Sequence, residues 1–339
     1  MNRPAAPGRP RPVTQEDVAR AVGVSRTLVS FAFRGTAGVS EETRKAILDA
    51  AKRLGYRPNA VAADLARKQA SAVGLYLLDL RNEVYADIFL GVRESLGQAA
   101  NRLILSVSRT TSGIGDGSIG SLIEARVGVI IAATLIDTDE QVQELARTVA
   151  LINVARHVQG VDSVYSDDRA GARMATEHLL NLGHTRIMHV SGPRHKGHEG
   201  RWRAYEATMR DAGLTPHVVF ADDFTQEAAE RSAATLLAHP DRPTAVFAHN
   251  DQLALGIREA AYKRGLTVPG DLSLVGYDDS RIAGIHGIDL TSVDLHALEL
   301  GREAGAAALD RLANPDAPVV DRSSQPRLVV RGSTAPRDT

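Results

Sequence analysis

From residue 71 onward, short apolar segments alternate with segments of helical character, and this alternation is the feature that most constrains the fold. The apolar segments are rich in β-branched residues and have no polar face, which is typical of parallel strands covered by helices on both sides. We predict strands at residues 72–78, 102–107, 127–132, 151–154, 186–190, 245–248 and 272–276.

Helical segments fit between these strands. Residues 85–100 form one, and residues 171–182 form another in which Ala175, Leu179 and Leu182 share a face. The pattern runs over roughly 270 residues, which is too long for one sheet of ordinary size, so we expect two lobes.

Residues 13–57 lack this alternation and are predicted to form three short helices. Thr14, Ser25 and Ser40 stand where helix N-caps are expected, and Gly23 and Gly55 stand where helices end. Two helices joined by a tight turn at a glycine are typical of a helix-turn-helix unit. The alternative is an ordinary three-helix bundle.

The charge distribution favours the helix-turn-helix interpretation. Residues 1–70 hold 13 basic and 6 acidic residues, a net charge of +7, whereas the rest of the chain carries −8. A basic module on an acidic body is typical of a protein that binds a polyanion. A chance surface bias is the alternative.

Residues 1–12 are rich in proline and have no apolar core, so we expect a disordered arm and no signal peptide. The longest apolar run, residues 127–136, is about half the length of a spanning helix. Cysteine is absent. These features predict a cytoplasmic protein, acting at the nucleoid if it binds DNA, with no membrane contact and no disulfide.

Eight segments, in chain order, resemble the lactose-repressor/galactose-repressor family of transcriptional regulators. They are VTQEDVARAVGVS (13–25), VSEETR (39–44), LGYRPNAVAADLA (54–66), SDDRAGA (166–172), LGHTRI (182–187), AHNDQLALG (248–256), VPGDLSLVGYDD (268–279) and VVRGST (329–334). The resemblance spans residues 13–334 and implies a helix-turn-helix head, a hinge helix and a core of two Rossmann-like lobes, similar to periplasmic binding proteins.

The resemblance also implies domain boundaries. The head covers residues 13–58, the hinge 59–70 and the core 71–334, followed by a tail at 335–339. Lobe 1 would comprise about 71–162 and 294–323, and lobe 2 about 163–292 and 325–334, with the chain crossing near residues 162, 293 and 324. The family further implies a homodimer on a near-palindromic operator. The short tail leaves no room for the helix that makes some relatives tetrameric.

By resemblance, Arg26 and Thr27 read base edges from the start of the second helix. Arginine suits the two acceptors of guanine, with a phosphate contact as the alternative. Phe31 replaces a frequent arginine and could touch a thymine methyl group or pack on a neighbouring helix. Hydroxyl groups that could contact the DNA backbone belong to Thr14, Ser25, Ser30, Thr36 and Ser40.

The hinge follows Pro58, and Asn59 can cap its short helix, which is marginal alone and should fold on operator DNA. By resemblance, Leu65 wedges into the minor groove and Ala62 lets the helix approach the groove floor. A rigid linker with an ordinary leucine is the alternative. Asp64 has no explanation beside DNA.

Candidate effector-binding residues lie in loops after predicted strands, where such folds bind ligands. They are Asp79, Asn82, Tyr85, Asn153, Asn250 and Asp278. Arg201, four residues before Tyr205, is added because it resembles the ligand-binding arginine of the family. Their side chains suit the hydroxyl groups of a sugar or polyol, and a ligand that prefers one lobe arrangement would change DNA affinity. Alternatively, Asn250 and Asp278 only cap helices and brace loops.

Three positions depart from the pattern of the family. Leu295 replaces a glutamine of sugar-binding relatives, the 81–85 loop reads RNEVY, and Asp168 replaces a frequent asparagine.

Other function classes are weaker. The predicted core also fits a solute-binding receptor, but the expected lack of a signal peptide and the basic head argue against it. A nucleoid-type protein that binds DNA without sequence preference is a further alternative, which an even footprint on random DNA would support. An enzyme is not expected, because G-x-S-x-G, H-E-x-x-H and P-loop motifs are absent. His195 and His198 have a weak metal-binding spacing without a third ligand, so no metal or cofactor is expected.

Overall fold

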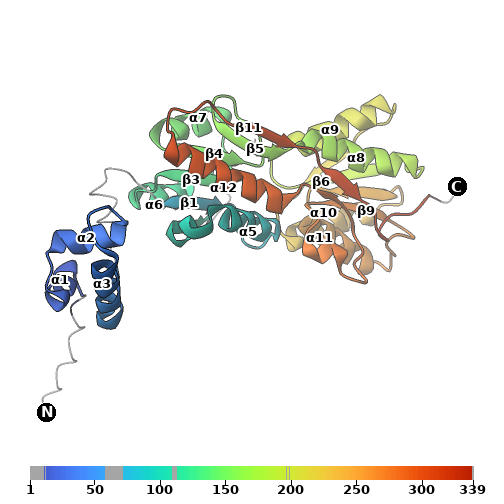
Figure 1. Cartoon of the computed structure of the whole chain (residues 1–339). Helices are drawn as coiled ribbons and strands as arrows, with labels where there is room; N and C mark the ends of the chain where they lie inside the picture. Colours follow the sequence, from blue (N-terminus) through green and yellow to red (C-terminus); the bar gives the residue numbers. More distant parts are fainter. Residues whose placement is uncertain are drawn as a thin grey trace, which may run out of the picture. The chain divides into compact units, whose positions relative to one another are not determined.

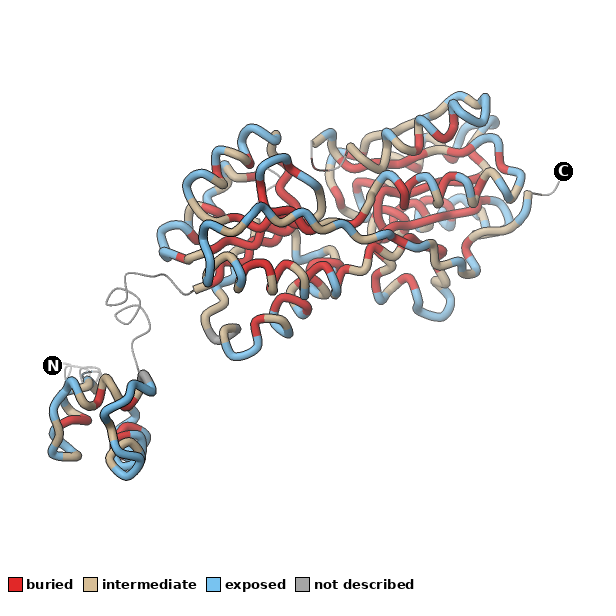
Figure 2. The backbone as a smooth tube through the Cα atoms, turned by 45° about the horizontal axis from the view of Figure 1, so that its top comes forward, coloured by how far each residue is buried: buried red, intermediate tan, exposed pale blue. Residues whose placement is uncertain are grey.

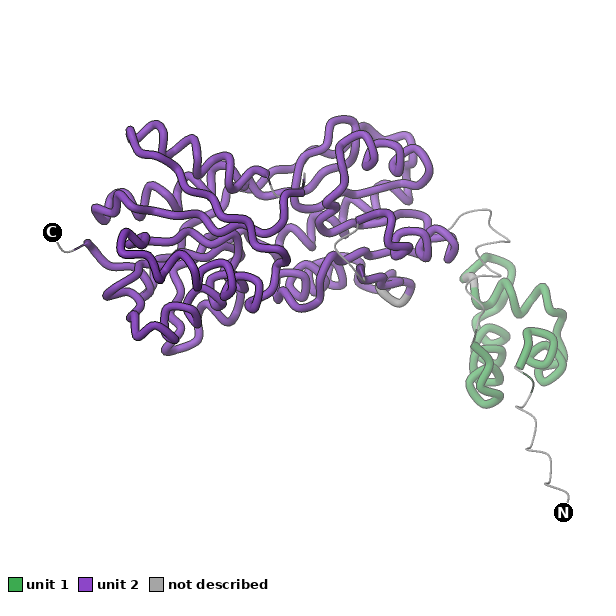
Figure 3. Tube along the Cα trace, turned by 180° about the vertical axis from the view of Figure 1, so that it is seen from behind, with its two compact units in different colours: residues 1–70 green, residues 71–339 purple. Residues whose placement is uncertain are grey.

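The fold was analysed in a computed structural model, which describes residues 11, 13–57, 72–108, 113–195, 197 and 199–337 (Figure 1). Buried residues gather in the head and in the core (Figure 2). The chain accordingly divides into two compact units, residues 1–70 and 71–339 (Figure 3). Most of the expected N-terminal arm and the whole expected hinge lie outside the described residues.

Within its described residues, the first unit holds three helices, as the sequence predicted. They are α1 (Gln15–Val22), α2 (Arg26–Arg34) and α3 (Glu41–Leu54). The hydroxyl oxygens of Thr14, Ser25 and Ser40 each accept a backbone N–H bond at a helix start. Gly23 and Gly55 end helices with φ of 76° and 71°, a conformation that suits glycine.

The first lobe of the second unit holds a six-stranded parallel sheet. Its spatial order is β11-β5-β4-β3-β1-β2. The strands are β1 (Val73–Leu77), β2 (Leu103–Val107), β3 (Val129–Ala133), β4 (Ala150–Val154), β5 (Asp162–Ser166) and β11 (Asp321–Ser324).

The second lobe holds another six-stranded sheet, ordered β12-β10-β9-β8-β6-β7, in which only β12 is antiparallel. Its strands are β6 (Ile187–Ser191), β7 (Val218–Phe220), β8 (Ala245–Ala248), β9 (Ser273–Tyr277), β10 (Thr291–Asp294) and β12 (Arg327–Val329). The two sheets confirm the predicted fold of two Rossmann-like lobes.

Helices cover both faces of each sheet. In lobe 1, α5 and α12 pack on one face and α6 and α7 on the other. In lobe 2, α8 and α9 pack on one face and α10 and α11 on the other. Lobe 1 contains α5 (Val84–Leu96), η1 (Gly97–Arg102), η2 (Gly113–Asp116), α6 (Ser118–Glu124), α7 (Asp139–Thr148) and α12 (Ala297–Ala313). Lobe 2 contains α8 (Asp168–Asn181), α9 (Glu199–Asp211), α10 (Gln226–Leu237), α11 (Asp251–Tyr262) and η4 (Arg281–Gly284).

The chain passes between the lobes after β5, after β10 and between β11 and β12 (Figure 1). The first crossing therefore follows Ser166 and not residue 162, so residues 163–166 belong to lobe 1. The sequence DSVYS gave no apolar signal for this strand, because three of its five side chains are polar. Four other short strands, β7, β10, β11 and β12, were also not predicted.

Helix boundaries also differ slightly from the prediction. The segment predicted as one helix at 85–100 is α5 followed by the 3₁₀ helix η1, because Gly97 turns the chain at a φ of 51°. Helix α8 begins three residues before its predicted start, since the Asp167 carboxylate accepts from the backbone N–H groups of Arg169 and Ala170.

Helices α5 and α12 lie side by side and touch through their glycines (Figure 1). A Cβ atom on Gly91 would lie 2.1 Å from the carbonyl oxygen of Leu298, and one on Gly301 would lie 2.2 Å from that of Ile88. This contact joins the beginning and the end of lobe 1. Among the described residues, no helix is long and apolar enough to cross a membrane.

Candidate functional site

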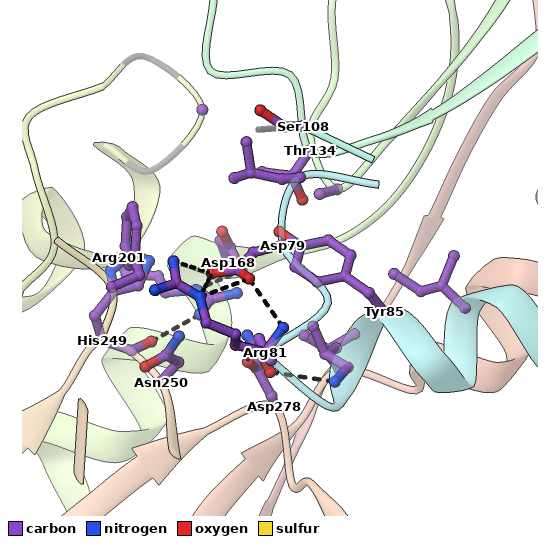
Figure 4. Close-up of a pocket in the computed structure, with 18 of the residues that line it drawn as sticks. Asp79, Arg81, Tyr85, Ser108, Thr134, Asp168, Arg201, His249, Asn250 and Asp278 are labelled. Carbon is purple, nitrogen blue, oxygen red and sulfur yellow. Dashed lines mark hydrogen bonds and ion pairs between the residues drawn. The ribbon is translucent and has the colours of Figure 1, made fainter. Parts of the chain in front are cut away.

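A cavity of about 670 Å³ lies between the two lobes (Figure 4). Many of its polar residues directly follow the carboxyl ends of strands. Among them are Ser108 after β2, Thr134 after β3, His249 after β8 and Asp278 after β9. Parallel strands bring their carboxyl ends to one edge of a sheet, so two facing sheets line a single cleft.

Several residues at these strand ends have left-handed backbones. Thr134, Ala155 and Asp278 each stand directly after a strand and have φ values of 66°, 94° and 99°. A left-handed backbone is costly for a residue with a Cβ atom, so the surrounding fold must hold it in place. Residues with such backbones are concentrated at ligand-binding sites.

Arg201, in the first turn of α9, is the centre of the polar network (Figure 4). Its Nε donates to Asp168 Oδ1 at 3.1 Å, and its Nη1 lies 3.3 Å from Asp278 Oδ1. Nη1 also donates to the carbonyl oxygen of His249 at 2.7 Å, and the guanidinium lies 3.6 Å from the Tyr277 ring centre. Burial acts against its charge, but Asp168 and Asp278 outweigh burial and raise the pKa of Arg201.

Asp278 connects the two lobes. Its second carboxylate oxygen accepts from the Nδ2 of Asn82, a lobe 1 residue, at 3.0 Å. Burial raises the pKa of Asp278 to about 6, against the opposing influence of Arg201 and Asn82.

Asp251 supports this network from the first turn of α11. Its carboxylate accepts from the backbone and hydroxyl of Ser280, at 2.7 and 2.8 Å, and from the hydroxyl of Ser292 at 2.6 Å. Burial and the nearby Asp278 raise the pKa of Asp251 to about 7. Asp251 thus holds the loop that carries Asp278, a role that the sequence analysis missed.

The loop after β1 makes the other contacts across the cleft. Arg81 pairs with Asp79 at 2.8 Å and reaches Asp223 of lobe 2 at 3.7 Å. The Glu83 carboxylate accepts from the backbone N–H of Ile282 at 3.3 Å. The RNEVY sequence therefore supplies three consecutive residues that contact lobe 2.

Six of the seven residues predicted for effector binding line the cavity: Asp79, Asn82, Tyr85, Arg201, Asn250 and Asp278. Asn250 also caps α11, because its Oδ1 accepts from the Leu253 N–H at 2.9 Å. Leu295 and Asp168, which depart from the family pattern, line it too.

Asn153 does not line the cavity, so its assignment was wrong. It is fully buried, and its Nδ2 donates to the carbonyl oxygen of Arg156 at 2.7 Å. Strand β4 ends at Val154, as predicted, and Val154 and Ala155 line the cavity instead. Successive side chains of a strand point to opposite sides, which explains the difference.

Several residues that line the cavity were not predicted, although the rule that ligand-binding residues follow strands could have found them. Ser108 and Thr134 directly follow strands, and Ser166 is the last residue of β5. The buried hydroxyl of Ser166 has no hydrogen-bond partner among the described residues. Phe224 and Asp223, which lie in a loop after the short β7, carried no comparable signal.

In the head, Arg26 and Thr27 are exposed in the first turn of α2, while Ser30 and Phe31 are half-buried. The hydroxyls of Thr14, Ser25 and Ser40 serve as helix caps. The predicted hinge residues Asn59, Ala62, Asp64 and Leu65 lie outside the described residues, as does His198. Within the described part of the chain, no three His, Asp or Glu side chains gather as metal ligands would.

A helix-turn-helix head on a two-lobed core with a polar cleft defines the class of ligand-responsive DNA-binding regulators. Comparison with known families agrees. Residues 14–59 match the model of bacterial regulatory proteins of the lacI family, and residues 176–334 match a periplasmic binding protein-like domain. The chain belongs to the lacI family and is a DNA-binding transcriptional regulator.

Relatives match almost the whole chain. Catabolite control protein A of Priestia megaterium is 31% identical over 86% of this chain and 90% of its own length. The ribose operon repressor of Escherichia coli K12 is 30% identical over 94% and 99%. These relatives are transcriptional regulators.

Solved structures agree with the fold. A lac repressor dimer bound to operator and the anti-inducer ONPF has a TM-score of 0.85 at 26% identity, covering 96% of this chain and all of that chain. A complex of the regulator CelR with cellobiose has a TM-score of 0.69 at 29% identity, covering 95% of this chain and all of that chain.

Proposed function

We propose that this protein represses transcription by binding a near-palindromic operator as a homodimer, under the control of an uncharged polyhydroxyl ligand in the cleft. It would act in the cytoplasm, on chromosomal DNA. The observation that carries this proposal is the Arg201–Asp278–Asn82 network, which joins both lobes inside a ligand-sized cavity.

The charges in the cleft support a neutral ligand. Each of its three arginines is already paired with a carboxylate: Arg201 with Asp168 and Asp278, Arg81 with Asp79, and Arg231 with Asp222. An anionic ligand would find no unpaired cation among them and would meet five aspartates. Hydroxyl groups of a ligand can instead donate hydrogen bonds to the lone pairs of these carboxylates that remain free.

Apolar side chains complete the lining. Tyr85, Phe224 and Leu295 supply surfaces for the C–H faces of a sugar ring. Leucine at 295 cannot hydrogen-bond, so the contact that a glutamine makes in other sugar-binding relatives is replaced here by packing. The CelR–cellobiose complex supports a saccharide.

The mechanism follows from the contacts across the cleft. The Asn82–Asp278 and Glu83–Ile282 bonds hold the lobes together, and a ligand that enters between them competes for the same groups. A ligand that prefers one lobe angle shifts the population of that arrangement. Operator DNA that also distinguishes the two arrangements is then coupled to the ligand. The ligand changes the affinity for DNA, and DNA changes the affinity for the ligand by the same factor.

We propose that Arg26 and Thr27 read base edges and that Leu65 wedges into the minor groove at the operator centre. Their exposure at the start of α2 supports the role of the first two. Thr14, Ser25, Ser30 and Phe31 would contact the DNA beside them, and Asn59 and Ala62 would position the hinge. The capping hydroxyls keep free lone pairs for phosphate-bound water.

The homodimer is supported by the edge of the lobe 1 sheet. Strand β2 is the edge strand, and its Ile104 and Leu105 side chains are 37% and 44% exposed. An open strand edge with exposed apolar residues is normally covered by a partner, here a second copy.

The proposal is tested by selecting duplexes from a random library with the full-length protein and then titrating the selected operator. Neutral sugars that raise the melting temperature of the protein are added to the titration. We expect an inverted-repeat operator whose affinity changes at least tenfold with one sugar, while sugar phosphates have no effect through the cleft. Unchanged operator affinity with a sugar demonstrably bound would refute the coupling, and the absence of a selected sequence would refute operator binding.

A further inference from the structure

A second cavity, of about 310 Å³, lies at the opposite end of the lobe 2 sheet from the cleft. Its lining comes from the residues that precede strands, among them Arg186 before β6, Arg242 and Thr244 before β8, and Asp271 before β9. Residues 335–337 complete it. Since these strands run about 15 Å toward the cleft, the two cavities are separate.

Three arginines line this cavity, and two of them have no carboxylate partner among the residues that the structure describes. Arg242 donates to the carbonyl oxygen of Asp271 at 2.7 Å and pairs with its carboxylate at 3.5 Å. The guanidinium of Arg337 donates to the hydroxyl of Thr244 at 3.4 Å. Within the described part of the chain, the guanidinium of Arg186 makes no hydrogen bond or ion pair.

A buried histidine organises the wall of this cavity. His184 is only 4% exposed, with its Nδ1 3.0 Å from the Thr244 hydroxyl and its Nε2 3.1 Å from the Ala335 carbonyl oxygen. A carbonyl oxygen only accepts, so Nε2 carries the proton and Nδ1 accepts from Thr244. The Thr244 oxygen is then free to accept from Arg337.

The same network fixes the segment that carries Arg337. The Ala335 N–H donates to the Ser273 hydroxyl at 3.1 Å, and the Arg337 N–H donates to the Leu182 carbonyl oxygen at 2.9 Å. Burial lowers the pKa of His184, which keeps the ring neutral at physiological pH. The positive charge of the cavity therefore comes from its arginines, of which one, Arg242, pairs with an acidic residue in the described part of the chain.

We propose that this cavity is a binding site for a phosphate group, either as inorganic phosphate or as the phosphate monoester of a small metabolite. Arginine presents several donors in a planar fork that matches the oxygens of phosphate. A cavity of about 310 Å³ holds a small molecule. The cleft between the lobes differs in this respect, because each arginine that lines it is paired with a carboxylate of the protein.

The test measures binding of inorganic phosphate and of glycerol 3-phosphate to the full-length protein by calorimetry at low ionic strength, with sulfate as a third ligand. We expect one site per chain. Equal affinity for the two phosphates would identify the phosphate group as the determinant, and tighter binding of glycerol 3-phosphate would identify a metabolite ester. Both results support the site.

The variant R186Q/R337Q should bind at least tenfold more weakly. Its matched control is R173Q/R210Q, which removes the same charge from helices α8 and α9 outside both cavities and should bind as the wild type does. The guanidinium of Arg186 has no hydrogen bond or ion pair with another described residue, so the single variant R186Q should keep the fold if the double variant does not. It should still weaken binding.

Two results would overturn the proposal. One is the absence of binding heat for any of the three anions up to about 10 mM, far above the Kd that a specific site requires. The other is equal weakening by R186Q/R337Q and R173Q/R210Q, which would show attraction to the general surface charge. Neither result bears on the cleft ligand or on operator binding.

Discussion

At the scale of single residues, the cleft is organised by charges that are buried together. Arg201 is 11% exposed and Asp278 3% exposed in their side chains, so neither is tolerable without the other. Removing one partner should therefore lower the free energy of unfolding by more than the pair contributes to it. This difference can be measured.

Arg201→Met should abolish ligand binding and lower the free energy of unfolding by about 3–5 kcal/mol, because Asp278 is left buried without its cation. Urea unfolding and calorimetry measure the two effects. Adding Asp278→Asn should recover part of the stability but none of the binding. No recovery in the double variant would show that lost packing on Tyr277, and not the stranded charge, causes the instability.

Asp251 gives the core an unusual pH dependence. Its pKa in the fold is raised from an ordinary value of 3.8 to about 7, so the fold favours the protonated form. This contribution is complete below about pH 4 and is lost as the pH rises through 7.

The stability of wild type relative to Asp251→Asn, a mimic of the protonated acid, should therefore fall by up to about 4 kcal/mol between pH 4 and pH 8. Urea unfolding of both proteins across this range measures it. Comparison with Asp251→Asn cancels the opposite trend of His189, whose pKa burial lowers to about 3. A constant difference across the range would mean that Asp251 remains ionised.

At the scale of elements, the pairing of α5 with α12 decides the integrity of lobe 1. The two helices come from distant parts of the chain and approach so closely that only glycine fits at Gly91 and Gly301. Helix propensity alone would favour alanine at both positions, so the tertiary contact overrides the local preference.

Gly301→Ala should lower the free energy of unfolding by about 2–3 kcal/mol, since the new methyl group would overlap the backbone of Ile88. Gly120→Ala is the matched control: Gly120 lies inside α6, and a Cβ atom there meets nothing within 4 Å. It should stabilise by about 0.5–1 kcal/mol. Similar effects of the two substitutions in thermal unfolding would argue against the close contact.

At the scale of the whole core, the lobe angle depends on few polar contacts. Asn82 is the residue that reaches Asp278 across the cleft. Replacing its amide by a carboxylate turns an attraction into a repulsion without changing the size of the side chain.

Asn82→Asp should open the cleft above pH 7 and let it close again near pH 5, where the two carboxyl groups can share a proton. Because the chain has no cysteine, spin labels at E124C and D211C report the distance between the lobes directly. Asn82→Ala is the control, since it removes the bond without adding charge. If the distance between the labels in Asn82→Asp does not change with pH, the contact between residues 82 and 278 does not determine the lobe angle.

Much of the architecture could be predicted from local signals. The apolar strands, the caps at Thr14, Ser25 and Ser40 and the glycine turn at Gly23 depend on short-range chemistry that a sequence displays. The rule that ligands bind after strands found five lining residues for the same reason, and resemblance to the family supplied the sixth, Arg201.

The tertiary structure alone decided the rest. Strand β5, with its polar sequence, becomes a strand only because β4 and β11 flank it. Asn153 does not line the cleft because its side chain points to the opposite side of β4 from Val154 and bonds the Arg156 carbonyl oxygen. The arginines beside His184 and the role of Asp251 arise from segments far apart in the chain. Local sequence determines which elements form, whereas burial and charge pairing between distant elements determine which side chains meet.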